Sequence, residues 1–164
     1  MAVSRVASLV TMARSIATTT TVDLAGLLDF VRPRHRMILS TYRRDGQVQA
    51  SPVTGGVDDS GRLVISTYPE RAKTRNVLRD PRVSVVVLSE EWNDPWVQVD
   101  GTAEVVLAED DVDPFVEYFH NIAGEHSDWE EYRQAMRDQG KALLRITPTR
   151  WGPVATGGFP ARLA

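Results

Sequence analysis

The chain has 164 residues, of which 42% are hydrophobic and 25% charged, the usual composition of one globular domain with a core of its own. Its formal net charge of −3 argues against a general nucleic-acid coat, so a local cluster of basic residues is informative. The lack of cysteine excludes disulfides, thiolate nucleophiles and cysteine-based metal sites, and it suits a reducing cytoplasm, which is the expected location.

Residues 1–21 are predicted to be a disordered N-terminal extension of a single domain at residues 22–164. The extension has two arginines, scattered apolar residues and no acid, and its longest apolar run is too short for a secretory signal. Met12 is an alternative start of the chain. No run of about 18 apolar residues occurs, so no membrane span is expected.

The first predicted element is a helix over residues 23–31. Asp23 is a suitable N-cap and Pro33 ends the helix. The apolar residues recur at the spacing i, i+3, i+4, i+7, which is typical of one helix face: Leu24, Leu27, Leu28 and Val31.

Two strands follow, in the segment "RMILSTYRRDGQVQASPVTGGV", with a tight turn at Asp45-Gly46. The segments "GRLVIST", "RVSVVVLSE", "WVQVDGTAEVVLA" and "KALLRITPTRWGPV" are rich in β-branched residues and predict four more strands. A short helix from about Arg71 to Arg79 separates the third strand from the fourth.

Two more helices are predicted between the fifth strand and the sixth. The first carries apolar residues on one face and ends at Gly124. The second has Ser127 as its N-cap with Glu130 three residues later, a capping box, and ends at Gly140. Trp129, on this second helix, is expected in the core.

Six mostly antiparallel strands with helices inserted late favour a mainly β fold, a closed or nearly closed barrel with peripheral helices. A doubly wound dinucleotide-binding sheet is disfavoured, because the helices do not alternate with the strands and no G-x-G-x-x-G turn occurs.

No self-sufficient catalytic apparatus is visible. The three histidines are His35, His120 and His126; they form no H-E-x-x-H motif, and no metal site is predicted. A G-x-S-x-G turn is also absent. No catalytic residue is therefore assigned, and an enzyme of this sequence needs a bound cofactor for its chemistry.

One cluster stands out at the point where the third strand, ending in Ser66 and Thr67, gives way to a helix. Free backbone N–H groups and the positive end of the helix converge there, which makes an anion site. Arg71, Lys73 and Thr74 add a guanidinium, an ammonium and a hydroxyl, a set suited to phosphate. The alternative is an ordinary solvated helix face, the reading we adopt for Arg75 and Arg79.

Trp92 and Trp96 flank the turn "NDP" between the fourth and fifth strands. An exposed indole there can stack on a flat ring, and a plain packing role is the alternative.

The stretch "STYPERAKTRNVLRDPRVSVVVLSEE", preceded by "ILSTYRRDGQVQASPV", resembles the split-barrel flavin-binding superfamily of the pyridoxamine 5'-phosphate oxidases. It is most similar to the actinobacterial branch that uses the deazaflavin coenzyme F420. The segment "NIAGEHSDWEEYRQAM" is similar to a helical segment of that branch. The resemblance covers roughly residues 24–152.

The resemblance implies a six-stranded antiparallel split β-barrel that forms homodimers with two cofactor sites at the subunit interface. It places a cofactor phosphate on the residues after the third strand, and the strand after the hairpin beside the ring system. An aromatic residue near Trp96 is expected to contact the partner chain's cofactor. The implied cofactor-binding residues are Gln49, Ala50, Ser51, Pro52, Ser66, Thr67, Arg71, Lys73, Thr74 and Trp96.

The implied activity is an F420-dependent transfer of hydride to an electron-poor small organic substrate, most simply as a reductase. An FMN-dependent oxidase of the pyridoxamine phosphate type is the nearest alternative, and a non-catalytic flavin or F420 carrier is another. The Gly-Gly pair in "TGGV", residues 54–57, is expected to leave an open pocket edge.

Overall fold

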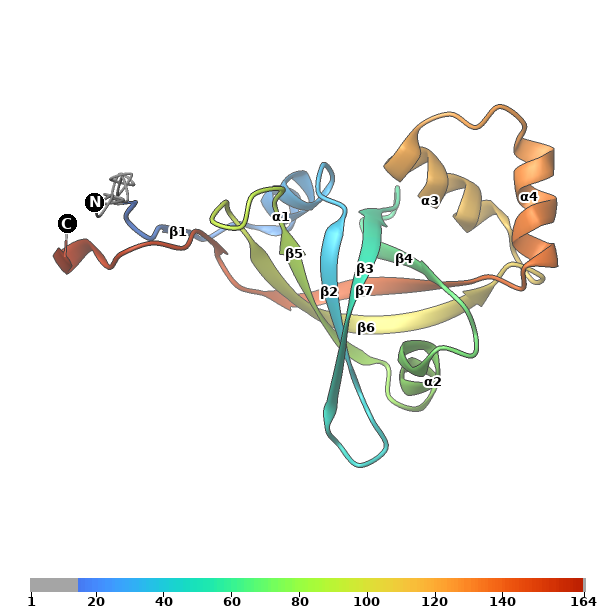
Figure 1. The fold of residues 1–164 in the computed structure, drawn as a ribbon, viewed down its shortest axis with the longest axis horizontal. Helices are drawn as coiled ribbons and strands as arrows, with labels where there is room; N and C mark the ends of the chain where they lie inside the picture. The colour runs from blue at the N-terminus through green and yellow to red at the C-terminus, as the bar shows by residue number, and fades with distance from the viewer. Residues whose placement is uncertain (1–14, 164) are drawn as a thin grey trace, which may run out of the picture.

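The computed structural model describes residues 15–163 of the chain. Six antiparallel strands close into a barrel in the order β2-β3-β4-β7-β6-β5, with helices at its periphery (Figure 1). This confirms the predicted fold class. The strands are β2 (Arg36–Tyr42), β3 (Val48–Val57), β4 (Leu63–Thr67), β5 (Arg82–Leu88), β6 (Val97–Leu107) and β7 (Ala142–Trp151).

The barrel core follows from strict alternation along the strands, since successive side chains of a strand point to opposite faces. β2 and β5 alternate buried and less buried residues along their whole length. Their inward side chains pack with those of β6 and β7 in one cluster that includes Leu39, Val85, Val99 and Ile146, all fully buried. Because β-branched side chains suit a pleated, half-buried surface, these strands were readable from the sequence.

Helix α1 (Leu24–Val31) adds Leu27 and Val31, both fully buried, to this core. Its predicted N-cap is confirmed, because the carboxylate of Asp23 accepts a 2.8 Å hydrogen bond from the backbone N–H of Gly26. The predicted turn of the β2–β3 hairpin is also confirmed, with Gly46 at a φ of 85° that favours glycine.

The barrel closes between β3 and β4 through a short ladder only. Residues 55–57 of β3 pair with residues 63–65 of β4, whereas β3 pairs with β2 along nearly its whole length. Residues 48–54 of β3 therefore have no strand on their second side, and this stretch is called the free edge of β3 below. The opening beside it is what splits the barrel.

Helices α3 (Asp113–Ala123) and α4 (Trp129–Asp138) pack on each other beside β4 and β7 and form a second core around the buried Phe115 (Figure 1). Trp129 is partly buried at the margin of this core rather than inside it. The predicted N-cap is one residue off, since Asp128 accepts from the N–H groups of Glu130 and Glu131 at 3.0 Å each.

The glycine pair of "TGGV" does not open a pocket edge. A Cβ on Gly55 would lie 2.5 Å from the Sδ of the buried Met37, and one on Gly56 would lie 3.4 Å from Ile122 of α3. Both glycines are buried; Gly55 leaves no room for a side chain towards the barrel core, and Gly56 packs against α3.

The terminal segments run side by side away from the barrel (Figure 1). Strand β1 (Thr19–Thr20) pairs antiparallel with β8 (Val154–Ala155), and a 3₁₀ turn, η1 (Ala161–Leu163), ends the described chain. The last part of the predicted extension is thus a strand rather than disordered chain. Residues 1–14, including Met12, lie outside the described residues.

Among residues 15–163, no helix is long and apolar enough to cross a membrane.

Candidate functional site

The centre of the candidate site is the corner where β4 passes into helix α2 (Ala72–Arg79). Arg71 is the N-cap of α2, and its side chain makes no capping hydrogen bond. Within the described chain, the N–H groups of Ala72 and Lys73 have no acceptor, as expected in the first turn of a helix. Two unpaired donors and the positive end of the helix dipole therefore meet at this corner.

Two buried threonines form the inner side of this corner. Thr74 is fully buried and donates its hydroxyl proton to the carbonyl oxygen of Tyr68 at 2.8 Å. Thr67 is 5% exposed, and its Oγ1 lies 3.4 Å from that of Thr74. In this conformation both hydroxyls hold the turn together, and the exposed surface of the corner is formed by Ser66, Arg71 and Lys73.

The two basic side chains of the corner differ in their surroundings. Arg71 is exposed, whereas Lys73 is partly buried. Burial lowers the pKa of Lys73, and the positive charge of Arg71 lowers it further. Neither side chain forms an ion pair within the described residues. The corner therefore carries two uncompensated cations that an anion would stabilise.

The rest of α2 is fastened to the barrel by a residue that the sequence analysis missed. Asn76 is 7% exposed, and its Nδ2 donates to the hydroxyl of Thr41 on β2 at 3.0 Å. Arg79, expected only as part of a solvated face, donates to the Asn76 side chain at 2.9 Å and to the Tyr42 carbonyl at 2.6 Å. The signal for this role in the sequence was the position of Asn76, a polar residue directly before Val77, the buried apolar residue of α2.

The four predicted residues of β3 divide between two faces. Gln49 and Ser51 point to the inner side with their β2 partners, while Ala50 and Pro52 lie on the outer side and are exposed. Gln49 accepts from Thr41 at 3.3 Å, so β3 and α2 share one polar network through Thr41. The Oγ of Ser51 is buried and has no hydrogen-bond partner within the described chain.

The backbone of the free edge offers further polar groups. The backbone N–H of Arg43 donates to the carbonyl oxygen of Gln47, and the N–H of Gly55 donates to the carbonyl oxygen of His35. The N–H and C=O groups of the odd-numbered residues of β3 therefore point towards β2. Even-numbered residues therefore point their N–H and C=O groups to the open side. Pro52 has no N–H and stands at an even position, where a proline does not interrupt the ladder with β2.

Tyr118 of α3 lies at the end of this opening that is marked by Thr54. The sequence analysis did not identify this tyrosine as a site residue. The hydroxyl of Tyr118 donates to the carbonyl oxygen of Thr54 at 2.9 Å. Burial raises the pKa of this phenol, and a hydrogen bond from the Ser66 backbone acts in the opposite direction. Nothing in the local pattern of α3 separates this tyrosine from its neighbours, because its partners come from two distant strands.

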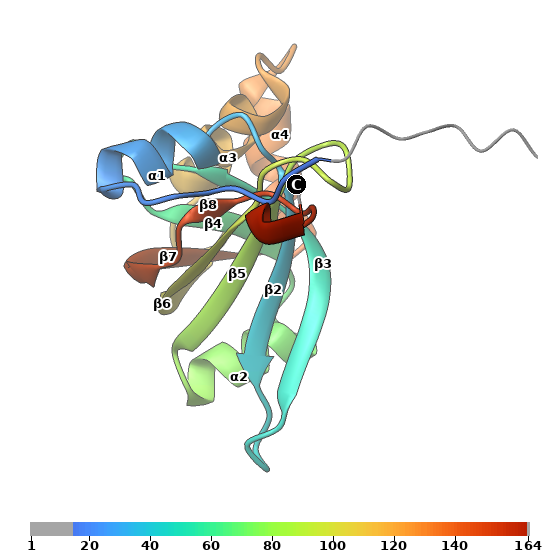
Figure 2. The same cartoon turned by 90° about the vertical axis from the view of Figure 1, so that its left-hand side faces the viewer.

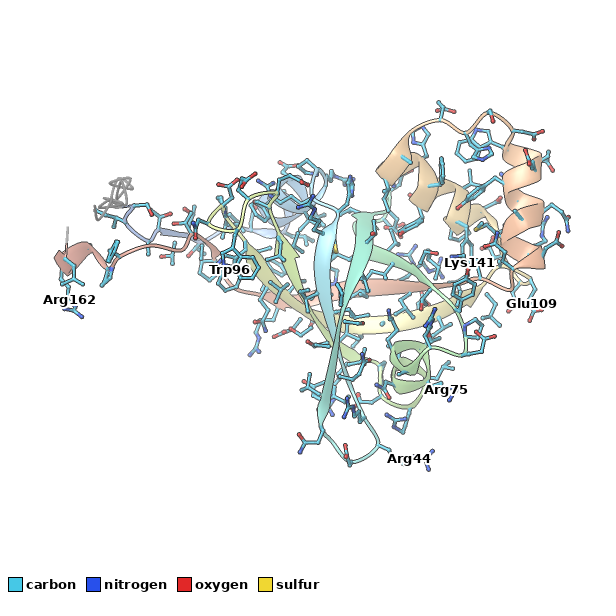
Figure 3. All side chains as sticks on the ribbon, in the orientation of Figure 1. Arg44, Arg75, Trp96, Glu109, Lys141 and Arg162 are labelled. Carbon is cyan, nitrogen blue, oxygen red and sulfur yellow. The ribbon has the colours of Figure 1, made fainter. Side chains whose placement is uncertain are left out.

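The structure does not bring Trp96 to this corner. Figure 3 shows Trp96 on the left of the barrel, towards the terminal segments, and Arg75, on α2, at its lower right. Trp96 is 38% exposed and borders a cavity of about 340 Å³ with Asp100, Arg150 and Trp151. Trp92, in the same loop, is 89% exposed. The residues around the Trp96 cavity include none of the corner residues.

Comparison with known protein families decides the family. The model of the pyridoxamine 5'-phosphate oxidase family matches residues 25–155, which is most of the chain. The chain belongs to this family. The match spans all six barrel strands, both helices of the second core and the corner at α2.

Solved structures show how widely this oxidase-family fold is shared. The conserved hypothetical protein Rv2991 of Mycobacterium tuberculosis is 22% identical, with a TM-score of 0.67 over 85% of this chain and 89% of its own. A protein described as an F420 reductase is 18% identical, with a TM-score of 0.59 over 76% and 94%. HutZ, a heme storage protein of Vibrio cholerae, is 17% identical, with a TM-score of 0.60 over 84% and 98%.

In this member of the oxidase family, the observed groups suit anion binding and ring placement better than acid–base catalysis. The corner supplies donors and positive charge, and the free edge supplies backbone donors and acceptors in one line. No group of three or more histidine, aspartate or glutamate side chains in residues 15–163 is arranged to hold a metal ion.

Proposed function

We propose that this protein is an oxidoreductase that binds the deazaflavin coenzyme F420 and reduces an electron-poor small organic substrate. The observation that carries the proposal is the corner at the start of α2. Two unpaired backbone donors and two uncompensated cations, Arg71 and Lys73, lie there beside the opening along the free edge of β3.

The corner fits a cofactor phosphate. A phosphate group needs several convergent donors, and the first turn of a helix together with a guanidinium supplies them. Lys73 is partly buried, so a bound anion would offset the cost of keeping its ammonium charged. Ser66, at the exposed end of β4, is the remaining hydroxyl donor, while Thr67 and Thr74 shape the turn.

The free edge of β3 fits the polar rim of a flat ring system. The outward N–H of Ala50 and the outward C=O of Pro52 are groups of the kind that pair with ring amides, while the C=O of Ala50 accepts a 3.2 Å hydrogen bond from the Nε2 of Gln49. The unpartnered hydroxyl of Ser51 and the amide of Gln49 lie on the inner side of the same strand. When bound, the deazaflavin supplies the hydride, and these residues orient the ring and exclude water.

A second copy of the chain completes the site in this proposal. The outer face of β2, β3 and β5 carries the apolar side chains of Ile38, Pro52, Val86 and Leu88 on one side of the sheet. Figure 2 looks onto these strands, and no helix covers their middle. Three of these residues, Ile38, Pro52 and Leu88, line a hollow of about 430 Å³. A homodimer through this face would allow Trp96 to reach the partner's ring.

The choice of F420 over FMN rests on the sequence resemblance described above and agrees with the fold shared with an F420 reductase. The FMN-dependent oxidase and the non-catalytic carrier remain the alternatives. The carrier also agrees with a storage protein among the proteins of this fold.

The test is a fluorescence titration of the purified protein with F420 and with FMN, followed by turnover of reduced F420 with a panel of activated alkenes, quinones and tetrapyrroles. Tighter binding of F420 with turnover supports the proposal. Preference for FMN moves the protein to the oxidase alternative, and tight F420 binding without turnover of any acceptor supports a carrier.

A further inference from the structure

The barrel opens at a defined fork between β3 and β4. Their last paired residues are Gly55 and Ile65, and the next residues of the two strands, Thr54 and Ser66, are not paired. Beyond this point β3 continues as the free edge, and β4 turns towards the corner at α2. The opening along the free edge of β3, in which the proposed cofactor ring lies, is called the slot below. The position of the fork sets where this slot begins.

The hydroxyl of Tyr118 lies at this fork and touches both strands. It donates to the carbonyl oxygen of Thr54 on β3 at 2.9 Å, and the backbone of Ser66 on β4 lies close enough to the phenol to lower its pKa. One side chain from a third element thus bonds to Thr54 and lies beside Ser66, the first residues of β3 and β4 that do not pair with each other. Thr54 also pairs with Arg36 of β2, and Ser66 with Leu143 of β7, so Tyr118 lies on the one side of each residue that has no strand partner.

Helix α3 is held firmly enough against β3 to keep the hydroxyl in place. Asn121, one turn after Tyr118, donates to the carbonyl oxygen of Val57 at 2.9 Å. Ile122 packs against Gly56, where a Cβ would lie 3.4 Å from its Cγ1. The three residues are spaced i, i+3, i+4 and so share one helix face that grips β3.

We infer that Tyr118 is a positioning residue that pins the fork between β3 and β4 and thereby sets the upper end of the slot in which the cofactor ring lies. The pin follows from the contacts in the ligand-free chain. Its consequence for the cofactor rests on the proposed function. Ser66 also borders the corner. Tyr118 therefore lies between the end of the slot that would hold the ring and the corner that would hold the phosphate.

Two tyrosine variants test this inference. Tyr118→Phe removes the hydroxyl and keeps the ring. Tyr132→Phe is the matched control, because the Tyr132 hydroxyl lies in the same pair of helices but donates to the Phe115 carbonyl oxygen, away from the fork. Amide hydrogen exchange at Ser66 is measured by NMR on the ligand-free proteins, and F420 affinity is measured by fluorescence.

Tyr118→Phe is expected to speed exchange of the Ser66 amide and to weaken F420 binding about three- to tenfold, the usual effect of one neutral hydrogen bond. Tyr132→Phe is expected to change neither. Unchanged exchange at Ser66 in Tyr118→Phe, or an equal effect of Tyr132→Phe, overturns the pin. Faster exchange with unchanged affinity overturns its role in the slot. A wild-type protein that binds neither F420 nor FMN refutes the proposed function, and the exchange data still decide the pin.

Discussion

At the scale of single residues, the two cations at the start of α2 are placed against the rule for helices. Cations are unfavourable near the positive end of a helix, and neither Arg71 nor Lys73 forms an ion pair among the described residues that would offset this. A locally unfavourable arrangement without a structural gain is typical of a binding site.

Arg71→Ala and Lys73→Ala are each expected to weaken cofactor binding by about 1.5–3 kcal/mol, the range for a hydrogen bond to a charged group. The free energy of unfolding should change little, since Arg71 is exposed and Lys73 is unpaired. Fluorescence titration and urea denaturation measure the two quantities. Arg75→Ala, an exposed change on the same helix, is the control and should bind normally. Normal binding by both corner variants would refute the phosphate site.

The lowered pKa of Lys73 predicts a pH dependence. A bound phosphate favours the ammonium and raises its pKa, so the contribution of Lys73 to affinity is complete below the pKa of the free protein. The pKa of Lys73 in the free protein lies below the usual value for lysine, and the contribution is lost as the pH rises from there through the higher pKa of the phosphate-bound state. Affinity should therefore fall at alkaline pH. In Lys73→Arg the guanidinium stays charged, and the fall should be absent. An identical fall in both proteins would assign it to another group.

At the scale of elements, the barrel depends on close approach between β6 and β7. The pairing shifts register at Asp100 and Gly101, which is a β-bulge, and a Cβ on Gly101 would overlap the carbonyl oxygen of Thr147. That contact is to backbone, so the added atom cannot be accommodated by rotating a side chain. Glycine at this position is required by packing rather than by its φ.

Gly101→Ala is expected to lower the free energy of unfolding by about 1–3 kcal/mol, the usual cost of overpacking. Gly152→Ala is the matched control, because a Cβ there meets no atom within 4 Å. Urea denaturation of both variants and the wild type measures the difference. Equal stability of the two variants would mean that β6 and β7 can separate at the bulge without cost.

At the scale of the whole molecule, the two parts of the proposed site lie on different parts of the barrel, and the proposal joins them through a second copy of the chain. The corner and Trp96 lie far apart within one chain (Figure 3). The uncovered face of β2, β3 and β5 provides an apolar surface for pairing, and a stable interface of this kind buries about 800 Å² per partner.

Ile38→Asp, in the middle of this face, is expected to prevent the proposed dimer and leave a monomer. In a two-fold interface each substitution occurs twice, and each buried unpaired charge costs about 3–5 kcal/mol. Light scattering measures the mass. Leu78→Asp, on α2, replaces a residue that is 70% exposed and should leave the dimer intact. A wild-type protein that is a monomer at working concentration would rule out the shared site.

The sequence alone was enough for the features whose signals are local. The Asp45-Gly46 turn and segments rich in β-branched residues predicted the six strands, Asp23 marked a cap, and the corner at Arg71 was predicted from a strand end followed by a helix start. The cap of α4 was placed one residue too early, because Ser127 and Asp128 are both good caps and only the backbone path chooses between them.

The tertiary structure decided which of those residues face a common space. The register with β2 put Gln49 and Ser51 on one side of β3 and Ala50 and Pro52 on the other, and the turn buried Thr74. Tyr118 reached the fork, and Asn76 reached Thr41, across long stretches of chain. Local sequence patterns report on neighbours within a few residues, whereas these contacts depend on strand register and helix packing between distant segments. The sequence by itself therefore determined the elements, the barrel and the place of the basic corner. Only the folded chain decided the free edge, the fork and the separation of Trp96 from the corner.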